Sequence, residues 1–289
     1  MLLPGGVAAA QELEPRAYSP SPVGVTFVVA GAGHLQGDIL TDPSIAIDDL
    51  HAKVNLVTFG YGRTFPVAGR QALWLVALPL ANLEASGRLG DHRESVTRTG
   101  VTDLHVKFSM GLVGAPALRP AEFAGAGRRT AIGASVSVVA PVGQYDDQKL
   151  INLSTHRWGF KPEIGISQPV RRWTIEGYAG VWLYTANDAF YPGSSRRTQN
   201  ALASLQAHIG YELGRHAWVA FDSTWYAGGQ SAVNGVPKDD RKRNTRVGAT
   251  LSIPTFQKQS IKFAYSTGAT TRVGSSFSSF AVFWQVTMF

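Results

Sequence analysis

Residues 201–213 read ALASLQAHIGYEL, and from Ala203 onwards apolar side chains alternate with polar or small ones. One set of alternate positions is apolar: Ala203, Leu205, Ala207, Ile209, Tyr211 and Leu213. The intervening positions are polar or small: Ser204, Gln206, His208, Gly210 and Glu212. Successive side chains of a β-strand point to opposite faces, so this pattern predicts a strand with one apolar and one polar face.

The same alternation recurs along most of the chain. It is equally regular at 103–112, where Val106 and Phe108 alternate with Lys107 and Ser109. About twelve segments fit the pattern: 23–33, 53–65, 72–84, 103–112, 132–138, 158–167, 173–185, 201–213, 218–226, 245–253, 261–266 and 280–289. An even number of alternating segments near 10 residues long is typical of bacterial outer-membrane barrels. The predicted fold is therefore an all-β, antiparallel, up-and-down transmembrane barrel.

A soluble β-sandwich also alternates, and three features weigh against it. Many of the runs are longer than the roughly 5–6 residues of an average soluble strand. The connections divide into tight turns at 66–71, 168–172, 214–216 and 255–259, and longer loops at 88–98, 144–157, 187–200, 228–243 and 268–276, with 114–129 as a long exception at the tight end. Aromatic residues gather near the ends of the runs, as in the aromatic girdles of membrane barrels.

The composition excludes several other classes of protein. The chain has 289 residues, a net charge of +7 and only 16% charged residues. It contains no cysteine, which excludes disulfides, cysteine nucleophiles and thiolate metal sites. The longest apolar run, 72–81, is half of the roughly 20 residues that a spanning helix needs, and Pro79 interrupts it.

The first ten residues, MLLPGGVAAA, resemble the end of a secretory signal peptide. Ala8 and Ala10 fit a small-x-small cleavage site, followed by the polar pair Gln11–Glu12. The alternative interpretation is an ordinary flexible tail. We expect residues 1–10 to be a leader remnant and residues 11–289 to form a single barrel domain.

The polar face of the strands is where function is expected. If the apolar face contacts lipid, the predicted lumen-lining residues are Asp103, His105, Lys107, Lys161, Glu163, Glu176, His208, Glu212, Asp222, Arg246 and Lys262. Charges of both signs can shape the passage of a solute. They can equally form a network of ion pairs that fills the barrel, because buried charges require partners.

Sequence motifs for catalysis and cofactor binding are poor. The segment 133–137 lacks the final glycine of a nucleophile elbow, and 31–37 misses the dinucleotide-binding spacing by one residue. The seven histidines show no ligand spacing, so we expect no metal, no cofactor and no enzyme activity. The basic segments 196–197 and 238–243 lack the aromatic interleaving of a nucleic-acid site, which favours contact with anionic outer-leaflet lipid and lipopolysaccharide.

A longer motif points to a family. Residues 143–165 read GQYDDQKLINLSTHRWGFKPEIG, which resembles the outer-membrane transporter family of the MetA-pathway of phenol degradation. Shorter stretches at 13–18, 114–118, 204–208, 239–241 and 246–251 are similar to the same family. The resemblance covers about 12–289 and implies a barrel that passes aromatic or other hydrophobic small molecules.

The sequence therefore predicts a non-enzymatic channel or transporter in the outer membrane of a Gram-negative bacterium. Twelve strands lie between the eight that enclose mainly side chains and the 16–18 that leave an open aqueous channel, which favours a narrow conduit for small solutes. The alternative is a structural or surface-binding barrel with an occluded lumen. The pattern predicts neither the solute nor the oligomeric state.

Overall fold

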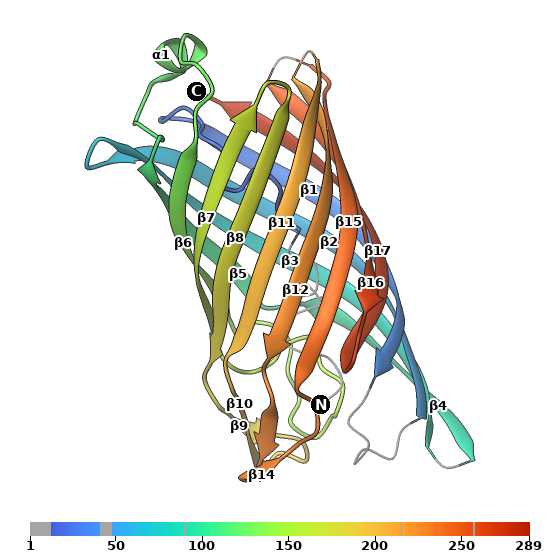
Figure 1. Cartoon of the computed structure of the whole chain (residues 1–289). Helices are drawn as coiled ribbons and strands as arrows, with labels where there is room; N and C mark the ends of the chain where they lie inside the picture. Colours follow the sequence, from blue (N-terminus) through green and yellow to red (C-terminus); the bar gives the residue numbers. More distant parts are fainter. Residues whose placement is uncertain (1–12, 41–47, 90, 215, 257) are drawn as a thin grey trace.

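The computed structural model describes residues 13–40, 48–89, 91–214, 216–256 and 258–289, and in them twelve long antiparallel strands form a closed barrel (Figure 1). The barrel strands are β1 (Thr26–Leu40), β2 (Asp48–Val67), β3 (Arg70–Leu89), β5 (Leu104–Val113), β6 (Ala131–Ala140), β7 (Gly159–Val170), β8 (Trp173–Tyr184), β11 (Leu202–Gly214), β12 (Ala217–Gly228), β15 (Lys242–Pro254), β16 (Gln259–Thr270) and β17 (Gly274–Met288). The predicted fold class and strand number are confirmed. The predicted leader remnant at 1–10 lies outside the described residues.

The ring is closed because every barrel strand pairs with two neighbours. The sheet runs β2-β1-β17-β16-β15-β12-β11-β8-β7-β6-β5-β3, and the additional β2–β3 pairing joins its two ends. A closed ladder leaves no unpaired strand edge, which is what a sheet in a bilayer requires. None of the helices in the described part of the chain is long and apolar enough to cross a membrane.

The two ends of the barrel differ in their connections. We call the end with the tight turns the turn end; there β2 and β3 are joined by Ala68 and Gly69, whose φ values are both positive (48° and 72°), as a type I′ hairpin requires. The connection 114–130 at this end carries the short helix α1 (Pro120–Ala124). We call the opposite end, with the connections 141–158, 185–201 and 229–241, the loop end. In outer-membrane barrels the long loops face the outside of the cell.

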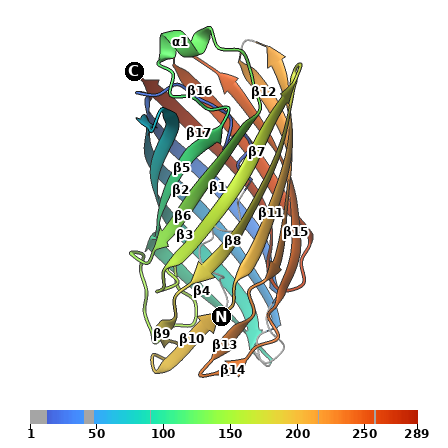
Figure 2. The ribbon, with the colours of Figure 1, turned by 60° about the vertical axis from the view of Figure 1, so that its left-hand side comes forward.

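Two of the predicted loops contain a small second sheet. It has the order β14-β13-β10-β9 and lies at the loop end (Figure 2). Its strands are β9 (Asn187–Phe190), β10 (Ser195–Gln199), β13 (Ser231–Val233) and β14 (Val236–Pro237).

The predicted loop at 88–98 is wrong. This segment continues the sheet as a hairpin between β3 and the additional strand β4 (His92–Val101). Its polar side chains pair across the strands, as in the 2.7 Å hydrogen bond that Asn82 Nδ2 donates to Thr99 Oγ1. A strand that projects past the bilayer needs no apolar face, so its polar composition resembles that of a loop.

Strand β3 changes its pairing partner from β5 to β4 near Thr102. The first half of β3 pairs with β5 and the second half with β4. Between them, Pro79 lacks an N–H, and its carbonyl accepts hydrogen bonds from the Thr102 amide and hydroxyl, at 3.0 and 3.1 Å. β6 pairs with β5 and not with β4, so β4 has no strand partner on its second edge within the described residues. The connection 141–158 begins at the end of β6, beside this edge.

The two faces of the barrel wall have opposite polarity. On β7, Ile164 is 53% exposed, whereas Lys161 and Glu163 are 3% and 5% exposed. On β12, Phe221 is 57% exposed and Asp222 is fully buried. The outer face is therefore apolar and the inner face polar, which is the reverse of the arrangement in a soluble domain. This arrangement fits a barrel surrounded by lipid.

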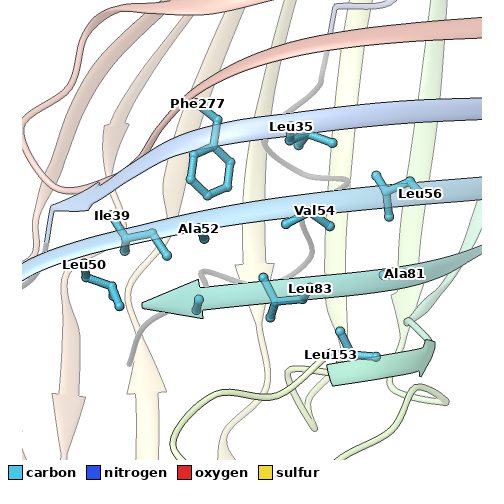
Figure 3. Packing of buried hydrophobic residues seen from close by; sticks show 11 residues of the cluster. Leu35, Ile39, Leu50, Ala52, Val54, Leu56, Ala81, Leu83, Leu153 and Phe277 are labelled. Carbon is cyan, nitrogen blue, oxygen red and sulfur yellow. The ribbon is translucent and has the colours of Figure 1, made fainter. Parts of the chain in front are cut away.

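This polarity inverts at the loop end of β1, β2 and β3. On the outer face, His34 Nδ1 lies 2.8 Å from Asn55 Oδ1, and His51 Nδ1 lies 3.0 Å from Asp38 Oδ1. The inner face of the same strand ends is apolar and packs against Leu153 of the connection 141–158 (Figure 3). We call this group the loop-end apolar cluster; its members are Leu35, Ile39, Leu50, Ala52, Val54, Leu56, Ala81, Leu83, Ala85, Leu153 and Phe277.

Candidate functional site

The N-terminal segment 13–25 lies against the inner wall of the barrel, where it contacts several of the predicted lumen residues. The Arg16 amide donates to Glu176 Oε2 at 2.6 Å, and the Ser19 hydroxyl donates to Glu176 Oε1 at 3.2 Å. The Lys107 ammonium donates to Glu14 Oε2 at 2.5 Å. The opposite charges of this ion pair hold the segment in place, and the positive charge of Lys107 lowers the pKa of Glu14 to about 2.

Tyr18 anchors this segment to the wall. Its hydroxyl donates to Glu163 Oε1 at 3.0 Å and lies 2.7 Å from Ser135 Oγ. Its ring lies against two glycines: a Cβ at Gly165 would fall 2.2 Å from the ring, and one at Gly133 would fall 2.6 Å from it. The two glycines leave a slot for the Tyr18 ring. Any larger residue at position 133 or 165 would fill this slot.

Lys161 and Glu163 form an ion pair with each other. The Lys161 Nζ–Glu163 Oε2 distance is 2.8 Å, and the two side chains are 4% and 1% exposed. Gln206 Nε2 also donates to Glu163 Oε2, at 3.1 Å. The spacing of two along one strand predicts that they share a face, as they do, and the ion pair forms within β7.

A second network crosses β11, β12 and β15. His208 Nδ1 lies 2.7 Å from Asp222 Oδ1, and the Thr250 hydroxyl donates to Asp222 Oδ2 at 2.7 Å. The His208 ring also contacts the Tyr178 ring, with centroids 4.9 Å apart. These groups fix a buried carboxylate, and within the described residues no group of three or more His, Asp or Glu side chains is arranged to hold a metal ion.

The other predicted lumen residues are distributed along the barrel. Glu212 lies towards the turn end and forms ion pairs with Arg16 and Arg128, at 3.2 and 3.3 Å. Arg246 Nη2 donates to the Ser266 hydroxyl and to the Phe277 carbonyl, both at 2.9 Å. Lys262 lies with its Nζ 5.9 Å from the Trp218 ring centroid.

Asp103 does not lie on a strand, unlike most of the other predicted lumen residues. It lies in the break between β4 and β5 and is 1% exposed. Its carboxylate accepts hydrogen bonds from the Gly143 amide at 3.3 Å and from the Thr155 amide and hydroxyl at 3.1 and 3.0 Å. The residue therefore fastens the connection 141–158 to the barrel.

A cavity of about 230 Å³ brings several predicted residues together. His105, Lys107 and Lys161 line it, with Glu14 from the N-terminal segment. Its remaining lining includes apolar groups that the alternation pattern does not single out: Leu56, Leu75, Ala77, Pro79, Trp182 and Phe283. A cavity of about 150 Å³ is enough to hold benzene, so one small aromatic molecule fits.

Known proteins share this architecture. An outer membrane channel from Pseudomonas putida F1 superposes with a TM-score of 0.82 at 20% identity, covering 96% of this chain and 100% of that one. The transport unit of the autotransporter AIDA-I from Escherichia coli superposes with a TM-score of 0.53 at 8% identity, covering 98% and 94%. These likenesses show the fold. No relative was found among curated protein sequences.

The family match is more specific than the shared fold. The family described as "Putative MetA-pathway of phenol degradation" matches residues 37–286, which is most of the barrel. Together with the closed barrel, its apolar outer face and its charged interior, this match identifies an outer-membrane β-barrel. The chain belongs to the family of the MetA-pathway of phenol degradation.

Proposed function

We propose that this protein is a non-enzymatic outer-membrane channel for small hydrophobic, especially aromatic, molecules. The observation that carries the proposal is the cavity of about 230 Å³ and its lining. Apolar side chains form one part of that lining, and His105, Lys107 and Lys161 form another. Sites of this kind bind apolar solutes and use a few polar groups to orient them.

Apolar side chains continue from the cavity towards the loop end. Leu56 belongs both to the loop-end apolar cluster and to the cavity lining. The cluster covers the inner face of β1, β2 and β3, where a water-filled porin would present polar groups. We infer that a hydrophobic solute from the loop end passes along this apolar face before it reaches the cavity.

The N-terminal segment disfavours bulk diffusion of polar solutes. Tyr18 and Arg16 contact wall residues on β7 and β8, so the segment occupies volume that an open pore would leave to water. We infer that the barrel selects its solutes by contact with the wall and not by size alone. The family membership supports this proposal.

Uptake in a porin-deficient Gram-negative host tests the proposed function. Expression of the protein is expected to increase uptake of labelled naphthalene over the empty host, and to leave glucose uptake unchanged. Naphthalene uptake equal to that of the empty host would contradict the proposal.

The alternative is a structural or surface-binding barrel with an occluded lumen, which the docked N-terminal segment favours. Planar-bilayer conductance separates the two. Reproducible ion steps support a conduit that opens around the segment, whereas a silent membrane together with unchanged naphthalene uptake supports the occluded barrel.

A further inference from the structure

Three cationic side chains are buried together at the loop end. Arg157 lies near the end of the connection 141–158, Arg197 lies on β10, and Lys242 begins β15. They are 3%, 5% and 8% exposed. The guanidinium groups of Arg157 and Arg197 repel the Lys242 ammonium, so the three charges are close enough to act on one another.

The surrounding protein supplies too little negative charge for these cations. Asp240 acts on all three cations, and Asp103 acts on Arg157 as well. The Asp240 oxygens already accept hydrogen bonds from the Ser231 amide and hydroxyl, at 2.7 and 2.6 Å. Within the described residues, none of the three cations lies within ion-pair distance of a carboxylate. Three positive groups facing two carboxylates, each of which is already hydrogen-bonded elsewhere, leave a buried excess of positive charge.

Several N–H donors of the same cluster are buried without a partner. They are Nε and Nη1 of Arg157, Nε and Nη2 of Arg197, and Nε2 of Gln199. Arg157 Nη2 donates to Gln199 Oε1 at 2.5 Å, and Arg197 and Gln199 lie two residues apart on the same face of β10, so these donors share one location. Buried donors of charged groups are costly to leave unpaired, which indicates that an acceptor from outside the chain belongs here.

Aromatic groups adjoin the cluster on the side of the cavity. The Arg157 guanidinium lies 4.3 Å above the Tyr184 ring, and Tyr184 stacks on Trp182 with centroids 6.1 Å apart. Trp182 also lines the cavity described above. The cationic cluster and the apolar cavity are thus joined by a pair of stacked rings along β8.

We propose that Arg157, Arg197 and Gln199 bind the carboxylate of an aromatic or other hydrophobic acid whose apolar body lies along Tyr184 and Trp182. A guanidinium group matches the geometry of a carboxylate and forms charge-assisted hydrogen bonds with it. The inference rests on the proposed function, and it adds a preference for amphipathic anions among the hydrophobic solutes. Burial and the repulsion of Arg197 lower the pKa of Arg157 to about 9, and a bound anion would relieve that repulsion.

Calorimetric titration of the detergent-solubilised protein near pH 7 tests this site with three probes: benzoate, benzyl alcohol and inorganic phosphate. Benzoate is expected to bind at least about tenfold more tightly than benzyl alcohol, because only benzoate offers a charged acceptor. Equal affinity for these two probes, or binding of phosphate without binding of benzoate, would overturn the carboxylate site.

Single substitutions provide the second arm. Arg197→Gln and Arg157→Gln should each weaken benzoate binding at least about tenfold, while benzyl alcohol binding stays within about twofold. Arg272→Gln is the matched control, because Arg272 lies at the same end in an exposed ion pair with Asp239, at 2.6 Å. Heat-modifiable migration on a gel checks that each variant is folded. Unchanged benzoate affinity in both site variants would overturn the proposal.

The two proposals fail in distinguishable ways. If wild-type protein increases naphthalene uptake but does not bind benzoate, the carboxylate site is wrong and the channel stands. If naphthalene uptake equals that of the empty host, the proposed function itself is wrong, whatever the calorimetry shows.

Discussion

The hydroxyl of Tyr18 donates a hydrogen bond of 3.0 Å to Glu163, and this contact joins the N-terminal segment to the barrel wall 145 residues away in sequence. The ring beside it fits only because positions 133 and 165 are glycines. We expect the state of the lumen to depend on whether the Tyr18 ring occupies this slot.

Filling that slot should open the lumen. Gly165→Val would place its Cβ 2.2 Å from the Tyr18 ring, so the ring must leave the wall. We expect a higher single-channel conductance in planar bilayers. Gly177→Val is the matched control on the adjacent strand, since a Cβ there meets no atom closer than 3.9 Å. Identical conductance in both variants would show that Tyr18 does not limit passage.

Glu163→Gln should destabilise the barrel and change its ion selectivity. The substitution removes the carboxylate that faces the Lys161 ammonium at 2.8 Å in a nearly fully buried pair. Breaking such a pair costs about 3–5 kcal/mol, whereas replacing both partners by apolar groups is often neutral. Urea unfolding in lipid vesicles should show this loss, and Lys161→Met combined with Glu163→Leu should recover most of it. Reversal potentials should shift towards anions, and unaltered selectivity would remove Glu163 from the pathway.

Docking of the N-terminal segment should depend on acid pH. The pKa of Glu14 is lowered from 4.5 to about 2, chiefly by the charge of Lys107. A carboxyl group with a lowered pKa stabilises the docked state above its undocked pKa, and this contribution is lost as the pH falls to the docked value. Conductance should therefore be constant from pH 7 to about 4.5 and rise between about 4.5 and 2. Glu14→Gln should remove this dependence and Glu122→Gln, on α1, should retain it; a wild-type profile in Glu14→Gln would contradict the assignment.

The two faces of β5 should respond differently to arginine. Phe108 is 43% exposed on the outer face, whereas the Lys107 side chain is 12% exposed inside. An arginine on the lipid face near the bilayer midplane costs roughly 2–4 kcal/mol. Phe108→Arg should lower the unfolding free energy in vesicles by about that amount, while Lys107→Arg keeps its charge and its contact with Glu14. Equal tolerance of the two would show that the faces are reversed, and a folded wild-type chain in detergent-free buffer would contradict the membrane barrel itself.

The barrel is predictable from the sequence because alternation is a local property. Between Phe160 and Ser167, the position of each residue in the alternation predicts which face of the strand it occupies. Twelve such runs predict the barrel without any knowledge of which strands pair. The alternation does not predict the strand in segment 88–98, because this segment projects beyond the lipid. Both faces of a strand can be polar there.

The interior is less predictable because its contacts are distant in sequence. Tyr18 meets Ser135 and Glu163 across 117 and 145 residues, and no periodic pattern marks it. Arg157 and Arg197 look like solvated loop charges in the sequence, and only the fold shows that both are buried. The glycines at 133 and 165, on the inner face of β6 and β7, are the one local signal that a ring must approach the wall closely.

The most direct test of the channel is to fill its cavity. Ala77 lines the cavity from β3, and its neighbour Leu78 faces outwards, opposite the exposed Phe59. Ala77→Trp should reduce naphthalene uptake by the porin-deficient host to that of the empty host, whereas Leu78→Trp should leave uptake at the wild-type level. Wild-type uptake by folded Ala77→Trp protein would contradict the assignment of this cavity as the path of the solute.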